Sequence, residues 1–597
     1  MIYSILVRLK KQNMAKDWQL AKTPTPSAIK GLSEYSELVS KLLFQRGIKT
    51  KTATEKFLKP DYDQDLHDPF LMKDMDKAAR RVLAAIEYNE KIIIFGDYDA
   101  DGVPGTAIIA TFFNHIGFKN YEAYIPDRHN EAYGLNSKAI EKFANDGVKL
   151  IITVDCGITN FDEVALADRL GIEVIITDHH LVPEKIPPAY AIVDAKQSDD
   201  DYPFKMLSGA AVAFKLILAI SRLKDFNLVS GWEKWLLDLV AISTITDMVA
   251  LEDENRTLAF YGLKVLRQTK RLGLVNLFAV AKIDMIHMTE DDIGFMIGPR
   301  LNSASRMSHA DDAFSLIMTT DSAEARVIAD QLEKQNKGRR EIVEKIIQDV
   351  VKVYNGGADS AKLIVLGSPD WGLGVLGLAS SRLVEKYGKP VFLWSKNSQG
   401  EIKGSCRSDG SINVVELMRA VGPDFFMDLG GHAMAGGFSL LAEREAELAV
   451  RLNGALEKIP QTAVETVLVA DAELSIDDIN RQTADEVLLL APFGMGNPKP
   501  IFLLRDLSLA EVKSFGNGGL HLELKFAKAD GSLVTAIGFF MCKPTFFAEK
   551  FDSKNGHKFS AVDLAIGRRV DMLASIEKSY FRGREEIRLR IVDIKHP

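Results

Sequence analysis

This chain is poor in cysteine, which limits the metal sites and cross-links it can form. Its 597 residues contain three cysteines, Cys156, Cys406 and Cys542, which lie far apart and in no C-x-x-C pair. An odd number of cysteines at such spacing fits neither a disulfide framework nor a zinc ribbon. Any metal site must therefore use oxygen and imidazole ligands.

The chain also lacks net positive charge and long hydrophobic runs. Its formal net charge is −8 at pH 7, so any contact with nucleic acid must use local basic patches. No apolar stretch approaches the roughly 20 residues that span a bilayer, and the N-terminal apolar run is too short for a signal peptide. We therefore expect a cytoplasmic protein. Its length predicts several structural units.

The middle of the chain alternates strand-like and helix-like segments. Between residues 91 and 265, the β-branched runs KIIIF, KLIITV and EVIIT are separated by amphipathic segments of helical length. This order is typical of a parallel α/β sheet. Residues 30–90 also show helical spacing. Residues 320–354 have apolar residues at helical spacing, interrupted only by Gly338. This spacing predicts one long connecting helix, or two.

The C-terminal half predicts two smaller domains. Strand-like KLIVLG and PVFLW with a helical segment between them favour a second α/β domain, and HLELKF, VDMLASI and EIRLRIVDI alternate at period two, which indicates a small antiparallel barrel. The predicted domains are an N-terminal helical extension (1–74), a parallel-sheet domain (75–319), a connecting helix (320–356), a smaller α/β domain (357–460) and an OB-like antiparallel β-barrel (461–597).

An acidic cluster follows the first predicted strand. In IIIFGDYDADG the apolar run leads directly into Asp97, Asp99 and Asp101. Three carboxylates so close together repel one another unless a cation lies among them. An EF-hand calcium loop would begin in the same way, but its twelfth position requires a bidentate Glu and here holds Ile108.

The same pattern recurs at the next two strands. KLIITV ends at Asp155, and EVIIT ends at Asp178, which is followed by His179 and His180. Open α/β sheets bind ligands beyond the carboxyl ends of their strands, so these side chains should converge. For a single Asp the common alternative is a helix N-cap. Three acidic strand ends with a His pair favour a dinuclear metal site.

Four motifs, DYDADG, VDCGIT, TDHH and ISTITDMVAL, resemble in order and spacing those of the DHH phosphoesterase superfamily. The resemblance implies that Asp155 bridges two ions, that Asp97 supports the first ion, and that His180 faces the scissile phosphate. The metal ligands that it implies are Asp99, Asp101, Asp155, His179 and Asp247.

One position departs from the superfamily pattern. Many relatives carry a ligating His where this chain has Phe95, which implies a weaker outer ion or one bound by Asp97 and water. Hard oxygen ligands with one imidazole suit Mn²⁺ or Mg²⁺. Two such ions can stabilise both the attacking and the leaving oxygen of an in-line displacement. We therefore expect hydrolysis of a phosphodiester.

The segment IGPRLNSASRM helps to narrow the substrate. It places Arg300, Asn302 and Arg306 within seven residues, and arginine is a common partner of phosphate. A structural salt bridge is the alternative for the arginines. The segment resembles one in the RecJ family of this superfamily, which short pyrophosphatases lack. The resemblance implies contacts with the DNA backbone.

Two further segments resemble the DHH-associated domain. GSCRS and GGHAMAGG contain Ser405, Arg407 and His432, and their glycines would let backbone amides approach a phosphate. A glycine turn with a buried His is the alternative. The resemblance implies phosphate contacts for all three residues. It also places Arg128 where the RecJ family holds the 5′-terminal phosphate.

The segment APFGMGNPKPIF resembles the start of the RecJ-family oligonucleotide-binding domain. In the last predicted hairpin, Tyr580, Phe581 and Arg582 combine aromatic and basic side chains, which can stack on bases and contact phosphates. A plain hairpin turn is the alternative. The resemblance covers residues 75–597.

The family resemblance implies processive 5′→3′ removal of nucleoside 5′-monophosphates from single-stranded DNA during repair and recombination. It also suggests a single-strand-binding protein and a helicase as partners. Two other classes stay open. A non-catalytic replication scaffold is disfavoured because the five implied ligands are intact, and a cyclic-dinucleotide or nanoRNA phosphodiesterase is disfavoured by the terminal barrel.

Overall fold

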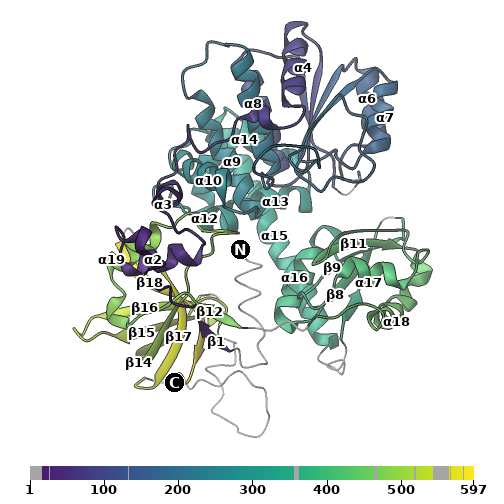
Figure 1. Ribbon diagram of the computed structural model, residues 1–597. Coiled ribbons are helices and arrows are strands. Elements are labelled where there is room, and N and C mark those ends of the chain that lie inside the picture. Colours follow the sequence, from purple (N-terminus) through teal and green to yellow (C-terminus); the bar gives the residue numbers. More distant parts are fainter. Residues whose placement is uncertain are drawn as a thin grey trace. The chain divides into compact units, whose positions relative to one another are not determined.

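The computed structural model describes residues 17–25, 27–128, 130–131, 133–354, 362–397, 399–462, 467–516, 519–541, 564, 566–581 and 584–597. The chain divides into two compact units, which are described separately (Figure 1). The α/β unit comprises Lys59–Ile342 together with Pro492–Asn497, and the composite unit comprises Met1–Leu58, Val343–Ala491 and Pro498–Pro597.

A five-stranded, fully parallel sheet forms the centre of the α/β unit, in the order β3-β2-β4-β5-β6. Alternate residues of β2 pack into two different cores, Ile92 and Ile94 into one and Ile93 and Phe95 into the other. Burial on both faces explains the continuous apolar runs of the sequence. The strands are β2 (Ile92–Gly96), β3 (Tyr121–Tyr124), β4 (Leu150–Val154), β5 (Glu173–Thr177) and β6 (Ala191–Val193).

Helices cover both faces of this sheet, as expected for a parallel α/β fold (Figure 1). The helices of the α/β unit are α4 (Met75–Glu87), α5 (Gly102–His115), α6 (Ser137–Asn145), α7 (Phe161–Arg169), α8 (Gly209–Leu223), α9 (Leu237–Thr246), α10 (Asp253–Leu266), α11 (Leu272–Ala281), α12 (Glu290–Asp292), α13 (Gly298–Met307) and α14 (Asp311–Met318), with short turns η2 (Pro69–Leu71), η3 (Trp232–Leu236) and η4 (Ile293–Ile297).

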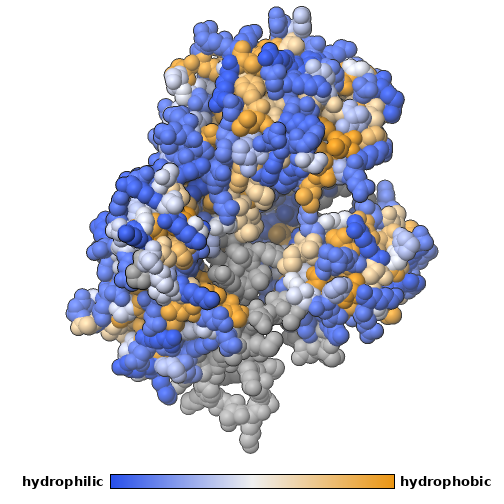
Figure 2. All heavy atoms as spheres, in the orientation of Figure 1, coloured by the Kyte–Doolittle hydropathy of each residue, from blue (hydrophilic) through white to orange (hydrophobic). Residues whose placement is uncertain are grey.

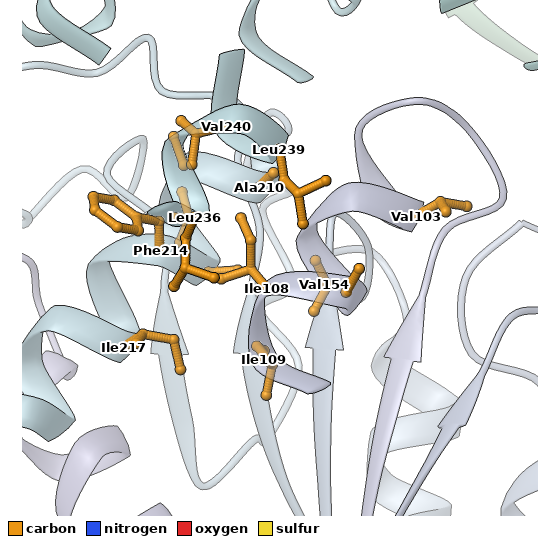
Figure 3. Packing of buried hydrophobic residues seen from close by; sticks show 14 of the residues in the cluster. Val103, Ile108, Ile109, Val154, Ala210, Phe214, Ile217, Leu236, Leu239 and Val240 are labelled. Carbon is orange, nitrogen blue, oxygen red and sulfur yellow. The ribbon is translucent and has the colours of Figure 1, made fainter. Parts of the chain in front are cut away.

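Close packing of α5 against β4 and α8 fixes the loop that carries the acidic cluster. Figure 3 shows Ile108 and Ile109 of α5 beside Phe214 and Ile217 of α8 and Val154 of β4. A Cβ on Gly105 would lie 2.5 Å from Val154 Cγ1 and 3.0 Å from the Cα of Ala210. Glycine at this position therefore allows α5 to approach both neighbours closely.

A single helix, α15 (Ser322–Tyr354), spans 33 residues and confirms the long connecting helix. Its buried residues Ala325, Ala329 and Leu332 recur at helical spacing. Gly338 lies within the helix without ending it. The cost of one interior glycine, about 1 kcal/mol, is small beside the burial of such an apolar stripe.

The smaller α/β domain of the composite unit has a mixed sheet in the order β10-β11-β9-β8-β7, in which only β7 and β8 are parallel. Its elements are β7 (Ile364–Gly367), η5 (Leu373–Val375), α16 (Leu376–Tyr387), β8 (Val391–Lys396), β9 (Ile402–Arg407), α17 (Val414–Val421), β10 (Asp428–His432), β11 (Ala435–Leu440), η6 (Ala442–Arg444) and α18 (Glu445–Leu456).

The C-terminal strands pair in a ring, β14-β15-β16-β18-β17, which closes because β17 also pairs with β14. The pairings in the ring are antiparallel except β16 with β18, so the predicted antiparallel C-terminal domain is confirmed with one parallel pair. The elements are β13 (Ala472–Glu473), η7 (Ile476–Asp478), α19 (Arg481–Leu488), β14 (Phe502–Phe515), β15 (His521–Ala527), β16 (Leu533–Gly538), β17 (Arg569–Phe581) and β18 (Arg584–Lys595).

The N-terminal extension packs against this C-terminal domain. It contains η1 (Lys30–Leu32), α2 (Glu37–Gln45) and α3 (Lys51–Leu58), and also a strand, β1 (Trp18–Leu20), which pairs in parallel with β12 (Leu468–Ala470). Gln45 donates from Nε2 to the Asp471 carbonyl at 2.8 Å, and Arg46 donates to the Pro498 carbonyl at 2.7 Å. The extension is therefore not purely helical.

A short segment of the C-terminal part belongs instead to the α/β unit. In Pro492–Asn497, the carbonyl of Met495 accepts from the amide of Leu251 at 2.7 Å, and the carbonyl of Pro492 accepts from Arg256 at 3.3 Å. Six residues of the segment that resembles the start of an oligonucleotide-binding domain thus pack with the α/β unit, whereas Ala491 and the residues from Pro498 onward belong to the composite unit.

The face shown in Figure 2 is covered mainly by hydrophilic residues, with scattered small hydrophobic patches. Among the described residues, no helix combines the length and the apolar character needed to cross a bilayer.

Candidate metal centre

Three acidic residues lie at the carboxyl ends of adjacent strands. Asp97 follows β2, Asp155 follows β4 and Asp178 follows β5. The backbone amide of each residue continues the hydrogen-bond ladder of its strand: Asp97 donates to the Val154 carbonyl at 3.2 Å, Asp155 to that of Thr177 at 3.0 Å and Asp178 to that of Val193 at 3.2 Å. The strand order changes direction between β2 and β4, because β3 lies on the other side of β2. Such a switch point is the usual ligand site of an open α/β sheet.

Side chains from separate motifs meet there in three overlapping groups whose ligand atoms lie within 4.8 Å of one another. His179 belongs to two of these groups, and its Nε2 lies 3.0 Å from Asp155 Oδ1, 3.6 Å from Asp101 Oδ2 and 3.8 Å from Asp247 Oδ2. The groups are Asp155 with His179 and His180, Asp101 with His179 and Asp247, and Asp97 with Asp99 and Asp155.

Two of these carboxylates have an oxygen that the protein does not satisfy. Oδ1 of Asp97 and Oδ1 of Asp155 are buried and accept no hydrogen bond from the described residues. Buried polar atoms are almost always paired, so such oxygens need a partner of another kind. A hard divalent cation is a suitable partner for these two oxygens, because Mn²⁺ and Mg²⁺ prefer carboxylate oxygen ligands to imidazole nitrogen.

The electrostatics point in the same direction. Burial raises the pKa of Asp97 and Asp155 well above the usual range, and neighbouring carboxylates, chiefly Asp99 for the first and Asp101 for the second, raise it further. Burial and then Asp101 and Asp99 raise the pKa of Asp247 in the same way. The ionised cluster is thus unfavourable by itself, and a cation would stabilise it.

Asp101 differs from the other acids because the protein satisfies its carboxylate. Oδ2 accepts from the amide of Gly209 at 2.8 Å, and Oδ1 accepts from the amide of Ala210 at 2.7 Å and the hydroxyl of Ser243 at 2.6 Å. These amides open helix α8, where negative charge is favourable. Asp101 therefore joins the acidic loop to α8 and α9.

The acidic loop is held in shape by two further side chains. Oδ1 of Asp99 accepts from the amides of Asp101 at 2.8 Å and Gly102 at 3.1 Å. Oδ1 of Asn302, on α13, accepts from the amide of Ala100 at 2.9 Å. Asn302, which the sequence suggested as a contact with DNA, thus fixes the loop that carries the candidate ligands.

His180 is oriented by Asp178. Its Nδ1 lies 2.7 Å from Asp178 Oδ1 and 3.3 Å from the hydroxyl of Tyr133, which donates to the Asp155 carbonyl at 2.9 Å. Burial lowers the pKa of His180, but the hydrogen bond and charge of Asp178 outweigh burial and raise that pKa to about 9. A fixed, cationic imidazole beside carboxylates suits an anionic substrate.

Phe95 has no ligand character. Its ring is fully buried and stacks on Tyr124 with the centroids 5.3 Å apart. It packs with Ile93 and Phe143 in the core on one face of the sheet. Any ion on the Asp97 side must therefore use Asp97 and its carboxylate neighbours.

The basic residues suggested by the sequence have different environments. The guanidinium of Arg128 lies 4.7 Å from the ring centroid of Tyr98, in the acidic loop, and Arg306 acts electrostatically on the same tyrosine. Arg300 is buried, pairs with Glu333 at 2.6 Å and donates to the Met296 carbonyl at 2.7 Å. These contacts favour the structural salt bridge for Arg300.

Ser405, Arg407 and His432 belong to the composite unit. Arg407 donates from Nη1 to Ser405 Oγ at 3.1 Å, and both side chains lie next to Gly377 in the first turn of α16. A helix start with a serine and an arginine is a suitable place for phosphate. His432 is exposed, so it is not the buried histidine of a turn. It pairs with Ala435 on β11, and Ala435 pairs with Arg407 on β9.

The last hairpin is described in part. Tyr580 is half-buried, and its hydroxyl donates to Glu585 at 3.3 Å across the β17–β18 pair. Arg582 and the side chain of Phe581 lie outside the described residues. The proposed base-stacking role of this hairpin stays a prediction.

Sequence reasoning missed a fourth acidic strand end. β6 is followed by Asp194, which is fully buried and whose Oδ2 has no hydrogen-bond partner among the described residues, and then by Lys196. The pattern AIVDAK is the signal that identified the other strand ends. Its short apolar run concealed the strand. Tyr98 and Tyr133, which lie beside the centre, had no such signal.

Family models match three parts of the chain. The DHH family N-terminal domain matches residues 91–244, the DHHA1 domain matches residues 360–458, and the RecJ OB domain matches residues 470–593. These ranges fall on the parallel sheet, the smaller mixed sheet and the C-terminal strands. The C-terminal fold is therefore an OB domain.

Curated relatives extend over most of the chain. The single-stranded-DNA-specific exonuclease RecJ of Haemophilus influenzae is 33% identical over 575 residues, which are 94% of this chain and 96% of that protein. RecJ of Bacillus subtilis is 37% identical over 528 residues, which are 87% of this chain and 65% of that protein. This chain thus spans under two thirds of the longer relative.

Solved structures show the same fold. RecJ from Thermus thermophilus in complex with Mn²⁺ has a TM-score of 0.79 at 27% identity and covers 97% of this chain and 80% of its own. An exonuclease RecJ bound to manganese has a TM-score of 0.57 at 32% identity and covers 65% of this chain and 96% of its own.

Proposed function

This chain belongs to the RecJ family, and from that premise we propose that it is a metal-dependent exonuclease specific for single-stranded DNA. It hydrolyses phosphodiester bonds from the 5′ end and releases nucleoside 5′-monophosphates, in DNA repair and recombination. The relatives that carry this specificity in their names match nearly the whole chain. The observation that carries the proposal is the pair of buried carboxylate oxygens of Asp97 and Asp155 at the strand ends, which accept no hydrogen bond from the described residues.

The proposed cofactor is Mn²⁺ or Mg²⁺, as two ions that share Asp155. When bound, such ions stabilise the charge that develops on a phosphoryl group in the transition state. We assign Asp101 a holding role, because its oxygens already accept three protein hydrogen bonds. This assignment differs from the sequence-based ligand set. Asp101 belongs to one of the three candidate groups, and from the other members of these groups we propose Asp97, Asp99, Asp155, His179 and Asp247 as the ligands.

The chain's own residues bind and orient the substrate. His180, held by Asp178, would donate from its other ring nitrogen to the scissile phosphate, and its positive charge would favour the developing negative charge. Arg128, next to the acidic loop, would hold the 5′-terminal phosphate. In the composite unit, Ser405 and Arg407 would bind phosphate at the start of α16, and His432 is a further candidate.

The OB domain and the partners complete the proposal. OB folds bind single strands by stacking and by backbone contacts without reading sequence, and Tyr580, Phe581 and Arg582 are candidates for this role. A helicase would supply the single strand, and a single-strand-binding protein would hold it open. We place this activity in the cytoplasm, where a bacterial-type repair nuclease meets DNA.

A digestion assay tests the function. The full chain is incubated with 30-mer DNA that is labelled at either end, single-stranded or duplex, with Mn²⁺, Mg²⁺ or chelator, and also with dinucleotides. We expect mononucleotides from the 5′ end of single strands only, and none with chelator. Activity restricted to dinucleotides, or none with either metal, would reject the proposal.

The variant Asp155→Asn links this activity to the site. It removes the shared charge while preserving side-chain size, so we expect a loss of at least about 10²-fold in rate. Lys185→Met is a matched control, since that lysine is largely exposed and its nearest carboxylate, on Asp162, lies 4.0 Å away. Asparagine also tolerates the left-handed backbone of residue 155, where φ is 61°.

A further inference from the structure

A lysine outside the four metal motifs lies beside the candidate metal centre. Lys196 follows β6 in a short turn, where its amide donates to Asp194 Oδ1 at 2.8 Å. Gln197 stiffens the turn, since its amide donates to the Asp194 carbonyl at 3.2 Å and its Nε2 donates to the Ile192 carbonyl at 2.8 Å. The backbone of Lys196 is therefore fixed at a strand end.

The side chain of Lys196 reaches back to the DHH motif. Its Nζ donates to the carbonyl of His179, the residue whose imidazole lies in the acidic cluster. The ammonium interacts electrostatically with Asp247 and with His179. It thus lies on the edge of the cluster and not on a remote surface.

This ammonium is only partly satisfied by the protein. Within the described ranges of the chain, the carbonyl of His179 is its hydrogen-bond acceptor, and its charge acts on Asp194 and Asp247 without an ion pair of 4.0 Å or less. A lysine has three N–H donors, so two are left for another acceptor. The residue is half-buried.

Most lysines of the same region differ in this respect. Lys205 donates to Asp200 Oδ1 at 3.0 Å and to the Asp200 carbonyl at 2.6 Å, and Lys73 pairs with Asp199 at 2.7 Å. A lysine placed next to an acidic centre without a paired carboxylate is suited to a second anion that is not part of the protein. At a phosphodiesterase centre that anion is the scissile phosphate.

We propose that Lys196 is a further catalytic residue, which donates a hydrogen bond from Nζ to a non-bridging oxygen of the scissile phosphate. The inference rests on the proposed function and extends it. It places a lysine from the β6 turn and His180 from the β5 end at the same phosphate. Positive charge fixed there stabilises the transition state more than the ground state, since negative charge increases on the phosphoryl oxygens.

The test compares three substitutions in the full chain. Lys196→Met removes charge and donor, Lys196→Gln retains a donor for the His179 carbonyl, and Lys196→Arg retains the charge. Lys205→Met is the matched control. The measurements are the single-turnover rate on saturating 5′-phosphorylated 30-mer, Mn²⁺ affinity by calorimetry, and DNA affinity by anisotropy without added metal.

We expect Lys196→Met and Lys196→Gln to lower the single-turnover rate by at least 10²-fold, about 2.7 kcal/mol in the barrier, with Mn²⁺ affinity within threefold of wild type. Lys196→Arg should recover at least tenfold of the loss. Lys205→Met should stay within twofold.

Two results would overturn the inference. One is a Lys196→Met rate within threefold of wild type. The other is a loss that follows weaker Mn²⁺ binding, because Lys196 would then act only through His179. If Lys196→Met unfolds, the comparison of the Gln and Arg variants decides, and equal rates reject the role. An inactive wild type would instead reject the proposed function itself.

Discussion

Asp101 and Asp155 lie in the same acidic cluster, but the structure predicts opposite effects on stability when each becomes asparagine. The carboxylate of Asp101 is 2% exposed and accepts from the amides of Gly209 and Ala210 and from the hydroxyl of Ser243. In Asp101→Asn one oxygen becomes an NH₂ group, which faces an N–H donor of the same kind. At least one buried amide then loses its acceptor.

The magnitude follows from these three hydrogen bonds. A buried donor left unpaired costs about 1–3 kcal/mol, and bonds to a charged acceptor lie at the upper end of such values. Asp101→Asn should therefore destabilise the metal-free protein by about 3 kcal/mol. For a unit of this size 1 kcal/mol shifts Tm by about 2–4 °C, so the expected fall is on the order of 10 °C.

Asp155→Asn should behave in the opposite way. Oδ1 of Asp155 has no hydrogen-bond partner among the described residues, and burial and neighbouring carboxylates raise the pKa of Asp155 well above its usual range. Removing the charge relieves this repulsion, so the metal-free Tm should rise by a few degrees. Mn²⁺ should then stabilise wild type and Asp101→Asn but hardly affect Asp155→Asn.

The assay is thermal unfolding by differential scanning fluorimetry at pH 7.5, with chelator and with Mn²⁺. The two variants are isosteric and remove the same charge, so each controls for the other. A metal-free Tm of Asp101→Asn equal to or above that of wild type would falsify the assignment of Asp101 as a holding carboxylate. Loss of the Mn²⁺-induced shift in Asp101→Asn would make it a ligand.

Three further outcomes are expected. Arg128→Ala and Arg407→Ala should remove the preference for 5′-phosphorylated over 5′-hydroxyl ends, measured by competition between the two substrates, and equal losses on both would place the phosphate pocket elsewhere. Burial raises the pKa of Asp194 to about 7 from 3.8. At about 1.4 kcal/mol per pKa unit, the free energy of unfolding of the metal-free protein should fall by up to roughly 4 kcal/mol as pH rises from 4 to 7. Asp194→Asn should flatten this dependence of Tm on pH, and an unchanged slope would contradict the prediction. Gly496 has φ +75° and lies beside a carboxylate oxygen, so Gly496→Ala should destabilise the α/β unit by about 1 kcal/mol or more in thermal unfolding. Gly531 has φ +82° with open space around it, so Gly531→Ala should cost only the backbone strain.

The sequence predicted that the acidic strand ends converge, because the signal for that convergence is local. In a parallel sheet every strand ends at the same edge, so acids directly after Gly96, Val154 and Thr177 had to converge. The structure brings Asp97, Asp155 and the DHH histidines together as this argument requires. Asp247, which follows helix α9 and no strand, was suggested only by the resemblance to the DHH superfamily.

The roles of individual residues within the centre could not be predicted in the same way. Whether an acidic side chain binds a metal ion or accepts hydrogen bonds from the N-terminus of a helix depends on residues that are distant in sequence. Asp101 accepts from residues 108 to 142 positions further along the chain. Arg300 likewise pairs with Glu333 on the following long helix, whereas its sequence context favoured a phosphate contact. Residue type and spacing report local structure and say little about such contacts.

The same limit applies to the contacts that support Asp247 at the candidate metal centre. Asp247 ends α9, and Met248 after it has φ 61°, so this ligand lies where the helix has already stopped. The chain is fixed again at Leu251, whose amide donates to Met495 in the short segment that the α/β unit takes from the C-terminal part. A candidate ligand outside regular structure is thus supported on one side by its own helix and on the other by Pro492–Asn497. The resemblance assigned that segment to the C-terminal domain, and the RecJ OB model, which matches residues 470–593, includes it. Its contacts with the α/β unit could not be predicted, because a loop without regular structure shows no pattern that identifies what it packs against.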